Sequence, residues 1–227
     1  AFRKYDSAGE MLYERRVQGR EIDPLVAAIP DRWPGRSPGQ LPPAFQARII
    51  RQVKPGVAAM RVGDPRDPGS TMGPLASQAQ FDRVQRFIRR GVEQGATLIA
   101  GGEGRPEGQA RGFFVRPTVF ADVERDMDIA REEIFGPVLS IMAYDDEADA
   151  IRIANDTIYG LQAYVFSSES RRAQRVAAQL AAGTVLINRI QPDLLAPFGG
   201  VKQSGVGREF GLAGLESYLE AKTVAGA

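Results

Sequence analysis

The chain has 227 residues, and its 29 Lys and Arg nearly balance its 28 Asp and Glu. This near-neutral charge gives no reason to expect nucleic acid or an anionic membrane as a partner. The sequence contains no cysteine and no histidine, which excludes disulfides, thiol nucleophiles, and imidazole as a general base or metal ligand.

The sequence also carries no sign of a membrane or secreted protein. No apolar run approaches the length that is needed to cross a bilayer, and residues 1–6 lack the apolar core of a signal peptide. We therefore expect a soluble, cytoplasmic protein. A chain of this length can bury roughly 70–75% of the surface that its unfolded form exposes, which is enough for one large domain or two small ones.

The first 60 residues carry weak structural signals. Loosely spaced apolar residues favour a helix over residues 1–20. Prolines recur through residues 23–43, which excludes a long helix or a central strand and predicts a loop or linker. Residues 44–60 have the spacing of a short helix, which Pro55 should break or kink. We treat residues 1–60 as an atypical N-terminal segment and residues 61–227 as the main domain.

A loop and a long helix are expected next. Residues 62–69 are dense in Gly, Pro and Asp, as in an ordered connecting loop. Ser77 is a suitable N-cap for a helix that runs to Gln94, because apolar residues recur at helical spacing between them. Gly95 stands where a C-cap glycine belongs.

Two strands of different kinds follow this helix. Residues 96–100 predict a short strand that stops at Gly101. Residues 113–120 return to extended character, but Pro117 cannot donate to a strand ladder. We therefore expect an edge or irregular strand there.

A stiff corner is predicted where a short helix over residues 126–133 ends. Glu132 and Glu133 are followed by Phe135 and by the rigid pair Gly136-Pro137, so the chain must leave the helix and straighten. Such a corner can offer a hydrogen-bond acceptor and a flat apolar face to a ligand that carries hydroxyls and a ring. The alternative is a solvated helix end with a buried aromatic side chain.

From residue 138 the pattern alternates between strands and helices. Strands separated by helices imply crossover connections and a parallel sheet with both faces covered, so the predicted fold class is α/β. The expected strands are 138–144, 163–166 and 184–188, and the expected helices are 147–155 and 168–182.

A glycine-rich loop and the last elements complete the chain. Four glycines between residues 199 and 207 permit a close approach of the backbone to a ligand or to another strand. A helix is expected over residues 210–219, and residues 222–224 are expected to add an edge strand.

Six short motifs stand in one order along the main domain. They are Val62-Gly63-Asp64-Pro65, Met72-Gly73-Pro74-Leu75, Gly112-Phe113-Phe114-Val115-Arg116-Pro117-Thr118, Glu132-Glu133-Ile134-Phe135-Gly136-Pro137-Val138, Asn155-Asp156-Thr157-Ile158-Tyr159-Gly160-Leu161 and Pro197-Phe198-Gly199-Gly200-Val201-Lys202-Gln203-Ser204-Gly205. In this order the motifs resemble the NAD(P)-dependent aldehyde dehydrogenase superfamily, over roughly residues 61–224.

The resemblance implies a C-terminal part of the catalytic domain, with the final strand that the family uses in subunit assembly. It implies NAD or NADP as cofactor, a small aldehyde as substrate, and association with a second copy or a related subunit. Glu133 would accept hydrogen bonds from the nicotinamide-side ribose hydroxyls, and Phe135 would pack near the nicotinamide ring.

The resemblance also implies a substrate tunnel. Phe198 would line it, and residues 190–196 lie where the family varies its aldehyde specificity. Gln191, Leu194 and Leu195 are therefore candidates for tunnel walls. The glycine-rich loop resembles a structural turn of the family, so Lys202 is not expected to be catalytic.

The chain departs from the family in its chemistry. Family members attack the aldehyde with a cysteine thiolate, transfer hydride to the cofactor, and hydrolyse the thioester with a glutamate acting on water. The chain has no cysteine, and we find no dinucleotide-binding domain before residue 61. A truncation, a disrupted reading frame or a degenerate relative would each explain this, and we expect the chain alone to be inactive.

One other function remains open, beside the alternative of a folded remnant with no present function. The main domain can act as a non-catalytic module that binds a full-length relative or itself. Ser204 and Lys202 share a loop, but no base accompanies the serine as a nucleophile. Asp145, Asp146 and Glu147 form no metal-ligand set and are typical of a helix N-terminus.

Overall fold

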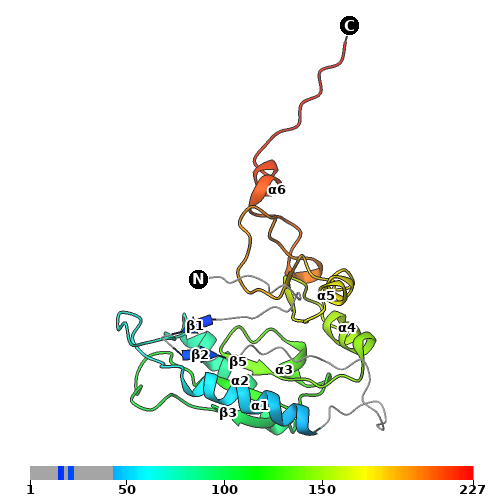
Figure 1. Cartoon of the computed structure of the whole chain (residues 1–227). Coiled ribbons are helices and arrows are strands. Elements are labelled where there is room, and N and C mark those ends of the chain that lie inside the picture. Colours follow the sequence, from blue (N-terminus) through cyan, green and yellow to red (C-terminus); the bar gives the residue numbers. More distant parts are fainter. Residues whose placement is uncertain (1–14, 18–19, 23–42, 227) are drawn as a thin grey trace. The chain divides into compact units, whose positions relative to one another are not determined.

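The computed structural model describes residues 15–17, 20–22 and 43–226, with side chains from residue 49 onward. The chain forms two compact units, which are described separately (Figure 1). One contains residues 36–145 and the other contains residues 146–227 with the N-terminal strands.

The N-terminal strands are β1 (Arg15–Val17) and β2 (Arg20–Ile22), which pair antiparallel. The helix predicted over residues 1–20 is therefore wrong at the residues that the structure describes, because the chain there pairs with itself in extended form. The rest of that prediction lies outside the described residues, as does the predicted linker except at Pro43.

The unit of residues 36–145 holds a three-stranded sheet in the order β3-β4-β5, in which β3 runs antiparallel and β5 parallel to β4. Its elements are α1 (Pro43–Ala58), α2 (Gln78–Glu93), β3 (Thr97–Ala100), β4 (Thr118–Ala121), α3 (Asp128–Arg131) and β5 (Val138–Ser140).

The sheet corrects one prediction from the sequence. The strand after Pro117 is central rather than an edge. Pro117 falls just outside β4, and the first ladder hydrogen bond comes from Thr118 N to Pro137 O at 2.9 Å. The missing N–H of the proline is therefore not needed by the ladder.

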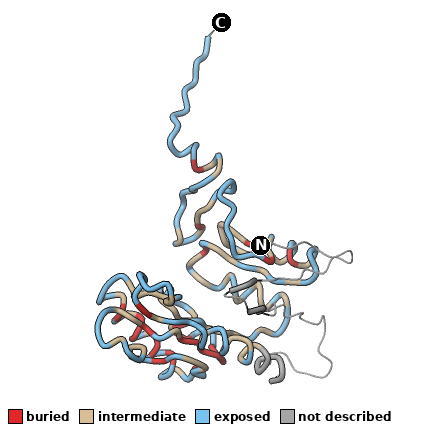
Figure 2. The backbone as a smooth tube through the Cα atoms, turned by 60° about the vertical axis from the view of Figure 1, so that its left-hand side comes forward, coloured by how far each residue is buried: buried red, intermediate tan, exposed pale blue. Residues whose placement is uncertain are grey.

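Helix α2 supplies one side of the core. Its N-cap is Ser77, whose Oγ accepts a hydrogen bond from Gln80 N at 3.2 Å, and Gly95 follows its C-cap with φ +95°. Both caps confirm the prediction for this helix. Its buried face packs with Phe120 of β4 and with Ile129 of α3. All four residues of β4 are buried, and most of the buried residues lie in this unit (Figure 2).

Helix α1 continues through Pro55 to Ala58, so the proline does not break it as predicted. Proline lacks one backbone donor, so a single hydrogen bond of the helix is lost, and the helix needs to continue only three residues beyond it. Ala59 N still donates to Pro55 O at 3.0 Å.

The second unit is built on two parallel strands joined by a helix. Strand β6 pairs with β7 in parallel, and α5 between them contacts both. Its elements are α4 (Glu147–Asn155), β6 (Gln162–Val165), α5 (Ser170–Ala177), β7 (Thr184–Ile187), η1 (Lys202–Ser204) and α6 (Gly211–Glu216).

The predicted α/β class with parallel strands is confirmed, although these strands divide between two sheets. Strand β5 is shorter than predicted because its neighbour β4 ends at Ala121, after which Asp122 turns the chain with φ +53°.

Residues after α6 form no helix or strand up to residue 226, and residues 215–226 are exposed. A strand requires a second strand to take its hydrogen bonds. The edge strand expected at residues 222–224 therefore does not form within this chain. Its pairing with another subunit stays a prediction. No helix in the part of the chain that the structure describes is long and apolar enough to span a membrane.

Candidate functional site

A corner forms between α3 and β5 as the sequence predicts, but the helix before it is shorter than the predicted 126–133, so Glu132 and Glu133 lie after its end. Helix α3 ends at Arg131, and Glu132 already has extended backbone angles of φ −104° and ψ 145°. Phe135 then turns the chain with φ +58°, and β5 begins at Val138. The chain therefore leaves a helix, bends once and straightens within a few residues.

Two side chains of helix α2 bind the backbone carbonyls of this corner. Gln80 Nε2 donates to Ile134 O at 3.1 Å and also to Phe135 O, and Arg83 Nη2 donates to Glu133 O at 2.7 Å. Three consecutive carbonyls are thus bound by two side chains one turn apart.

The corner also fits tightly against α2. A Cβ on Gly136 would lie 2.5 Å from Val84 Cγ2, so only glycine fits at that point. Ile134 is buried, at 8% exposure. The backbone of the corner is therefore fixed by both packing and hydrogen bonds.

The two candidate cofactor residues face solvent from this fixed backbone. Phe135 is 75% exposed, and Glu133 is exposed beside it. A left-handed φ is unfavourable for an aromatic residue, and burial of its ring does not offset that cost. Strained backbone of this kind clusters at functional sites. The predicted alternative, a buried aromatic at a solvated helix end, is wrong because Phe135 points outward.

Helix α3 is anchored at its first residue by the end of α2. The Asp128 carboxylate accepts hydrogen bonds from Arg90 Nε at 2.7 Å and from Gln94 Nε2 at 3.2 Å. Gln94 Oε1 accepts in return from Asp128 N at 2.9 Å. The Arg90 hydrogen bond is the main reason that the pKa of Asp128 is lowered. The segment that carries Glu133 is therefore fixed at both ends.

The candidate tunnel residues belong to the unit of residues 146–227, whereas Glu133 and Phe135 belong to the unit of residues 36–145. Leu194 is 63% exposed and Leu195 is 87% exposed, and Gln191 is also exposed. The loop that carries them is ordered by the hydrogen bond from Gly211 N to Leu194 O at 3.3 Å.

Phe198 is fixed by the chain that returns past it. Its backbone exchanges two hydrogen bonds of 2.7 Å with Glu209, and its ring centroid lies 6.1 Å from that of Phe210. The ring is half-buried. Phe198 and the leucines thus sit on one loop whose two ends are tied.

The glycine-rich loop packs on its own unit. Lys202 Nζ donates to Asn155 O at 2.9 Å and to Thr157 O at 3.0 Å, and Ser204 Oγ accepts from Gly160 N at 3.0 Å. A Cβ on Gly183 would collide with Gly199 O. The close approach that the glycines permit is therefore to neighbouring backbone. Lys202 and Ser204 have structural partners here.

Gln80 and Arg83 were not identified from the sequence. The residues they bind are 50 to 55 positions away in the sequence, so no local pattern indicates these contacts. Among the described residues, no group of three or more carboxylates forms a candidate metal site.

Comparison with known proteins decides the family. The model of the aldehyde dehydrogenase family matches residues 43–224. The chain belongs to the aldehyde dehydrogenase family. The resemblance over residues 61–224 is thereby confirmed, and the match extends it upstream through α1. A relative from Staphylococcus saprophyticus is 48% identical over 188 residues, which cover 82% of this chain and 39% of the relative.

Solved aldehyde dehydrogenases share the fold. A mutant of aldehyde dehydrogenase C from Pseudomonas syringae, in complex with NAD+ and octanal, is 46% identical with a TM-score of 0.76, over 79% of this chain and 37% of that one. The Mycobacterium tuberculosis aldehyde dehydrogenase in complex with NAD+ is 48% identical with a TM-score of 0.75, over 78% and 36%. This chain thus spans less than two-fifths of the aldehyde dehydrogenases it matches.

Proposed function

We propose that this chain forms the C-terminal portion of the catalytic domain of an NAD(P)-dependent aldehyde dehydrogenase, which oxidises a small aldehyde to a carboxylic acid. The observation that carries the proposal is the corner in which α2 binds the carbonyls of residues 133–135 while Glu133 and Phe135 face outward. The family match over residues 43–224 supports it.

The chemistry of the corner fits a nicotinamide riboside. The Glu133 carboxylate only accepts hydrogen bonds, and adjacent ribose hydroxyls donate them. The exposed face of Phe135 offers the flat apolar surface against which a nicotinamide ring can pack. The bound cofactor, NAD or NADP, supplies the hydride acceptor. The rigid backbone lowers the cost of ordering these two side chains when the cofactor binds.

Phe198, Gln191, Leu194 and Leu195 form the proposed wall of the substrate tunnel. Their support is the family resemblance and their shared, tied loop. Exposed leucines on such a loop suit the apolar tail of an aldehyde, and Gln191 suits a polar contact.

We further propose that the chain alone does not oxidise aldehydes. The family reaction begins with a cysteine thiolate, and these 227 residues contain no cysteine. Without a nucleophile, no covalent adduct forms from which hydride can be transferred. The residues described here would position cofactor and substrate, and the covalent step requires groups from outside them.

A chimera tests the proposed roles. In the Staphylococcus saprophyticus relative, the stretch that corresponds to residues 43–224 is replaced by those residues of this chain. We expect NAD(P)-dependent oxidation of aldehydes by the chimera. The substitution Glu133→Gln should then lower kcat/KM by about tenfold or more, because an amide binds ribose hydroxyls more weakly than a carboxylate.

Glu132 provides the matched control. It is an exposed neighbouring carboxylate whose Oε2 lies 3.8 Å from Arg83 Nη2. Glu132→Gln should leave kcat/KM of the chimera within about twofold. Equal effects of the two substitutions would show that Glu133 has no specific role in binding the cofactor.

A second candidate function is a non-catalytic module that pairs with another subunit. The observation in its favour is the run of exposed apolar side chains near the C-terminus, which includes Leu212 at 70%, Tyr218 at 88% and Val224 at 86%. Exposed apolar surface of this kind marks interaction sites. The partner would be a second copy or a related aldehyde dehydrogenase subunit.

A further inference from the structure

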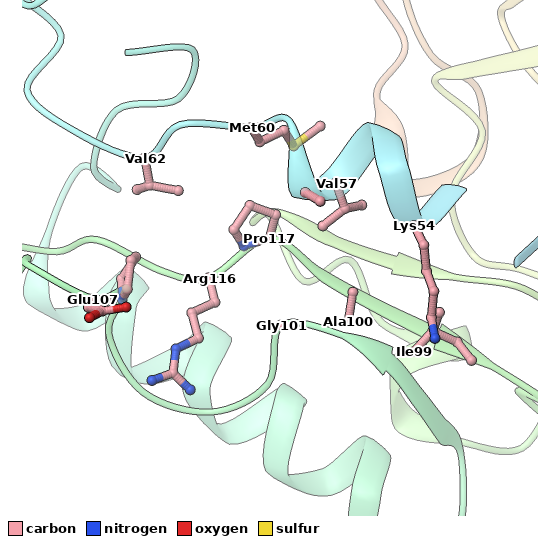
Figure 3. Close-up of a pocket in the computed structure, with 12 residues that line it drawn as sticks. Lys54, Val57, Met60, Val62, Ile99, Ala100, Gly101, Glu107, Arg116 and Pro117 are labelled. Atoms are coloured by element: carbon pink, nitrogen blue, oxygen red, sulfur yellow. The ribbon is translucent and has the colours of Figure 1, made fainter. Parts of the chain in front are cut away.

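A groove of about 580 Å³ opens between α1 and β3 (Figure 3), and residues 132–137 do not line it. Its volume lies in the range of small-molecule sites. Most of its lining is apolar, and none of it belongs to the residues discussed above as cofactor or substrate contacts. Its main apolar residues are Val57, Met60, Val62, Ile99, Pro106 and Pro117.

The two ends of the groove differ in charge. Lys54 extends from α1 towards Ile99 and Ala100 of β3, whereas Glu107 and Arg116 lie at the opposite end (Figure 3). Among the residues that the structure describes, no carboxylate pairs with Lys54. An ammonium group thus faces an apolar groove without a counter-ion from these residues.

Arg116 is already engaged by the protein. Its Nε donates to Arg105 O at 2.9 Å and its Nη1 donates to Glu103 O at 3.0 Å. Glu107 beside it would repel an anion. The end with Arg116 and Glu107 is therefore a poor place for a carboxylate, and the end with Lys54 is the favourable one.

We propose that this groove binds a straight-chain monocarboxylate, with the carboxylate at Lys54 and the alkyl chain along Val57, Ile99 and Pro117. The ammonium group and the carboxylate form a charge-assisted hydrogen bond. The alkyl chain is removed from water against apolar side chains, which favours longer chains over shorter ones. The proposal concerns a site separate from the cofactor corner and does not depend on dehydrogenase activity.

The test is calorimetric titration of the whole chain with decanoate below its micelle concentration. We expect saturable binding of one decanoate per chain, and weaker binding of hexanoate and of the neutral decanol. Lys54→Gln should weaken decanoate binding about tenfold and leave decanol binding unchanged. Both side chains are polar and Lys54 is exposed, so the fold tolerates the change.

Lys222→Gln is the matched control, because Lys222 is an exposed lysine outside the groove. It should leave decanoate affinity unchanged. Val57→Glu, which places a negative charge beside the alkyl chain, should abolish binding, with circular dichroism as the check on folding. The proposal is overturned by non-saturable binding, by equal affinity for decanol, or by equal losses at Lys54 and Lys222.

Discussion

Phe135 combines two features that rarely occur together. Its backbone has φ +58° and its side chain is 75% exposed. A left-handed backbone costs a residue with a Cβ about 1–2 kcal/mol, and an exposed ring recovers little of this by burial. A residue of this kind is better explained by what its ring can contact than by its contribution to folding.

We predict that Phe135→Gly does not destabilise the chain. Glycine relieves the left-handed strain. It also increases the conformational entropy of the unfolded chain, which lowers the free energy of unfolding by about 0.4–1 kcal/mol. The free energy of unfolding, measured in urea, should thus stay level or rise by up to about 1 kcal/mol. In the chimera the same change should raise the KM for NAD(P). A loss of stability above about 1 kcal/mol would mean that the ring is part of the core.

Gly136 is the opposite case, because its role is packing. A Cβ there would lie 2.5 Å from Val84 Cγ2, and Val84 is fully buried. Gly136→Ala should therefore lower the free energy of unfolding by about 1–3 kcal/mol. Gly73→Ala is the control, since its Cβ would meet Pro65 at an ordinary 3.7 Å. Similar urea midpoints for both variants would contradict the tight fit at Gly136.

At the scale of elements, the anchor between α2 and α3 depends on pH. The pKa of Asp128 is lowered chiefly by its hydrogen bond from Arg90, and Gln94 adds to the effect. Because the folded-state pKa lies below the ordinary value of 3.8, the stabilisation is present above that value. It is lost as the pH falls through the lower, folded-state pKa.

Arg90→Gln should move the pKa of Asp128 back up, as measured by NMR titration of its carboxyl group. Hydrogen exchange in α3 should also become faster at neutral pH, because the anchor is weakened. Arg86→Gln, on the same helix, is the control and should leave the titration of Asp128 unchanged. An unaltered pKa in Arg90→Gln would show that Arg90 is not the cause.

The side chains of Lys202 and Ser204 tie the glycine-rich loop to its unit. Lys202→Met removes two hydrogen bonds, to Asn155 O and Thr157 O, and should weaken the loop by about 1 kcal/mol. The amides of Val201 and Gln203, which donate to Gly160 O and Ile158 O, should then exchange about fivefold faster. Lys222→Met should change neither, and protection unchanged in both variants would contradict this role.

Short-range features of the elements were predictable from sequence. The caps at Ser77 and Asp146 form as expected, because a cap depends on residues within one turn. Long-range features were not. Gln80 reaches a carbonyl 55 residues away, and the central position of β4 depends on its two partner strands. No local pattern around Pro117 indicates that the ladder begins one residue later.

The candidate site was predicted in part for the same reason. Glu133, Phe135 and the stiff corner follow from Gly136-Pro137 and from the family resemblance. The side chains that hold the corner come from α2, 50 to 55 positions away in the sequence. Their role became visible only from the hydrogen bonds of Gln80 and Arg83.

At the scale of the whole molecule, the exposed C-terminal residues predict assembly. Tyr218, Leu219 and Val224 are at least 63% exposed, and an edge strand formed with another subunit would cover such side chains. Light scattering should therefore show a dimer or larger species. Deletion of residues 219–227 should yield the monomer. If the deletion leaves the number of subunits unchanged, this segment has no role in assembly.

We propose that the chain carries the cofactor corner of an aldehyde dehydrogenase without the nucleophile. The most direct measurement is the initial rate of NADH formation from NAD+ and a panel of aldehydes, for the chain alone and for the chimera. We expect no turnover by the chain and clear turnover by the chimera, which Glu133→Gln should slow about tenfold or more and Glu132→Gln should leave within about twofold. Turnover by the cysteine-free chain, or a folded but inactive chimera, would contradict it.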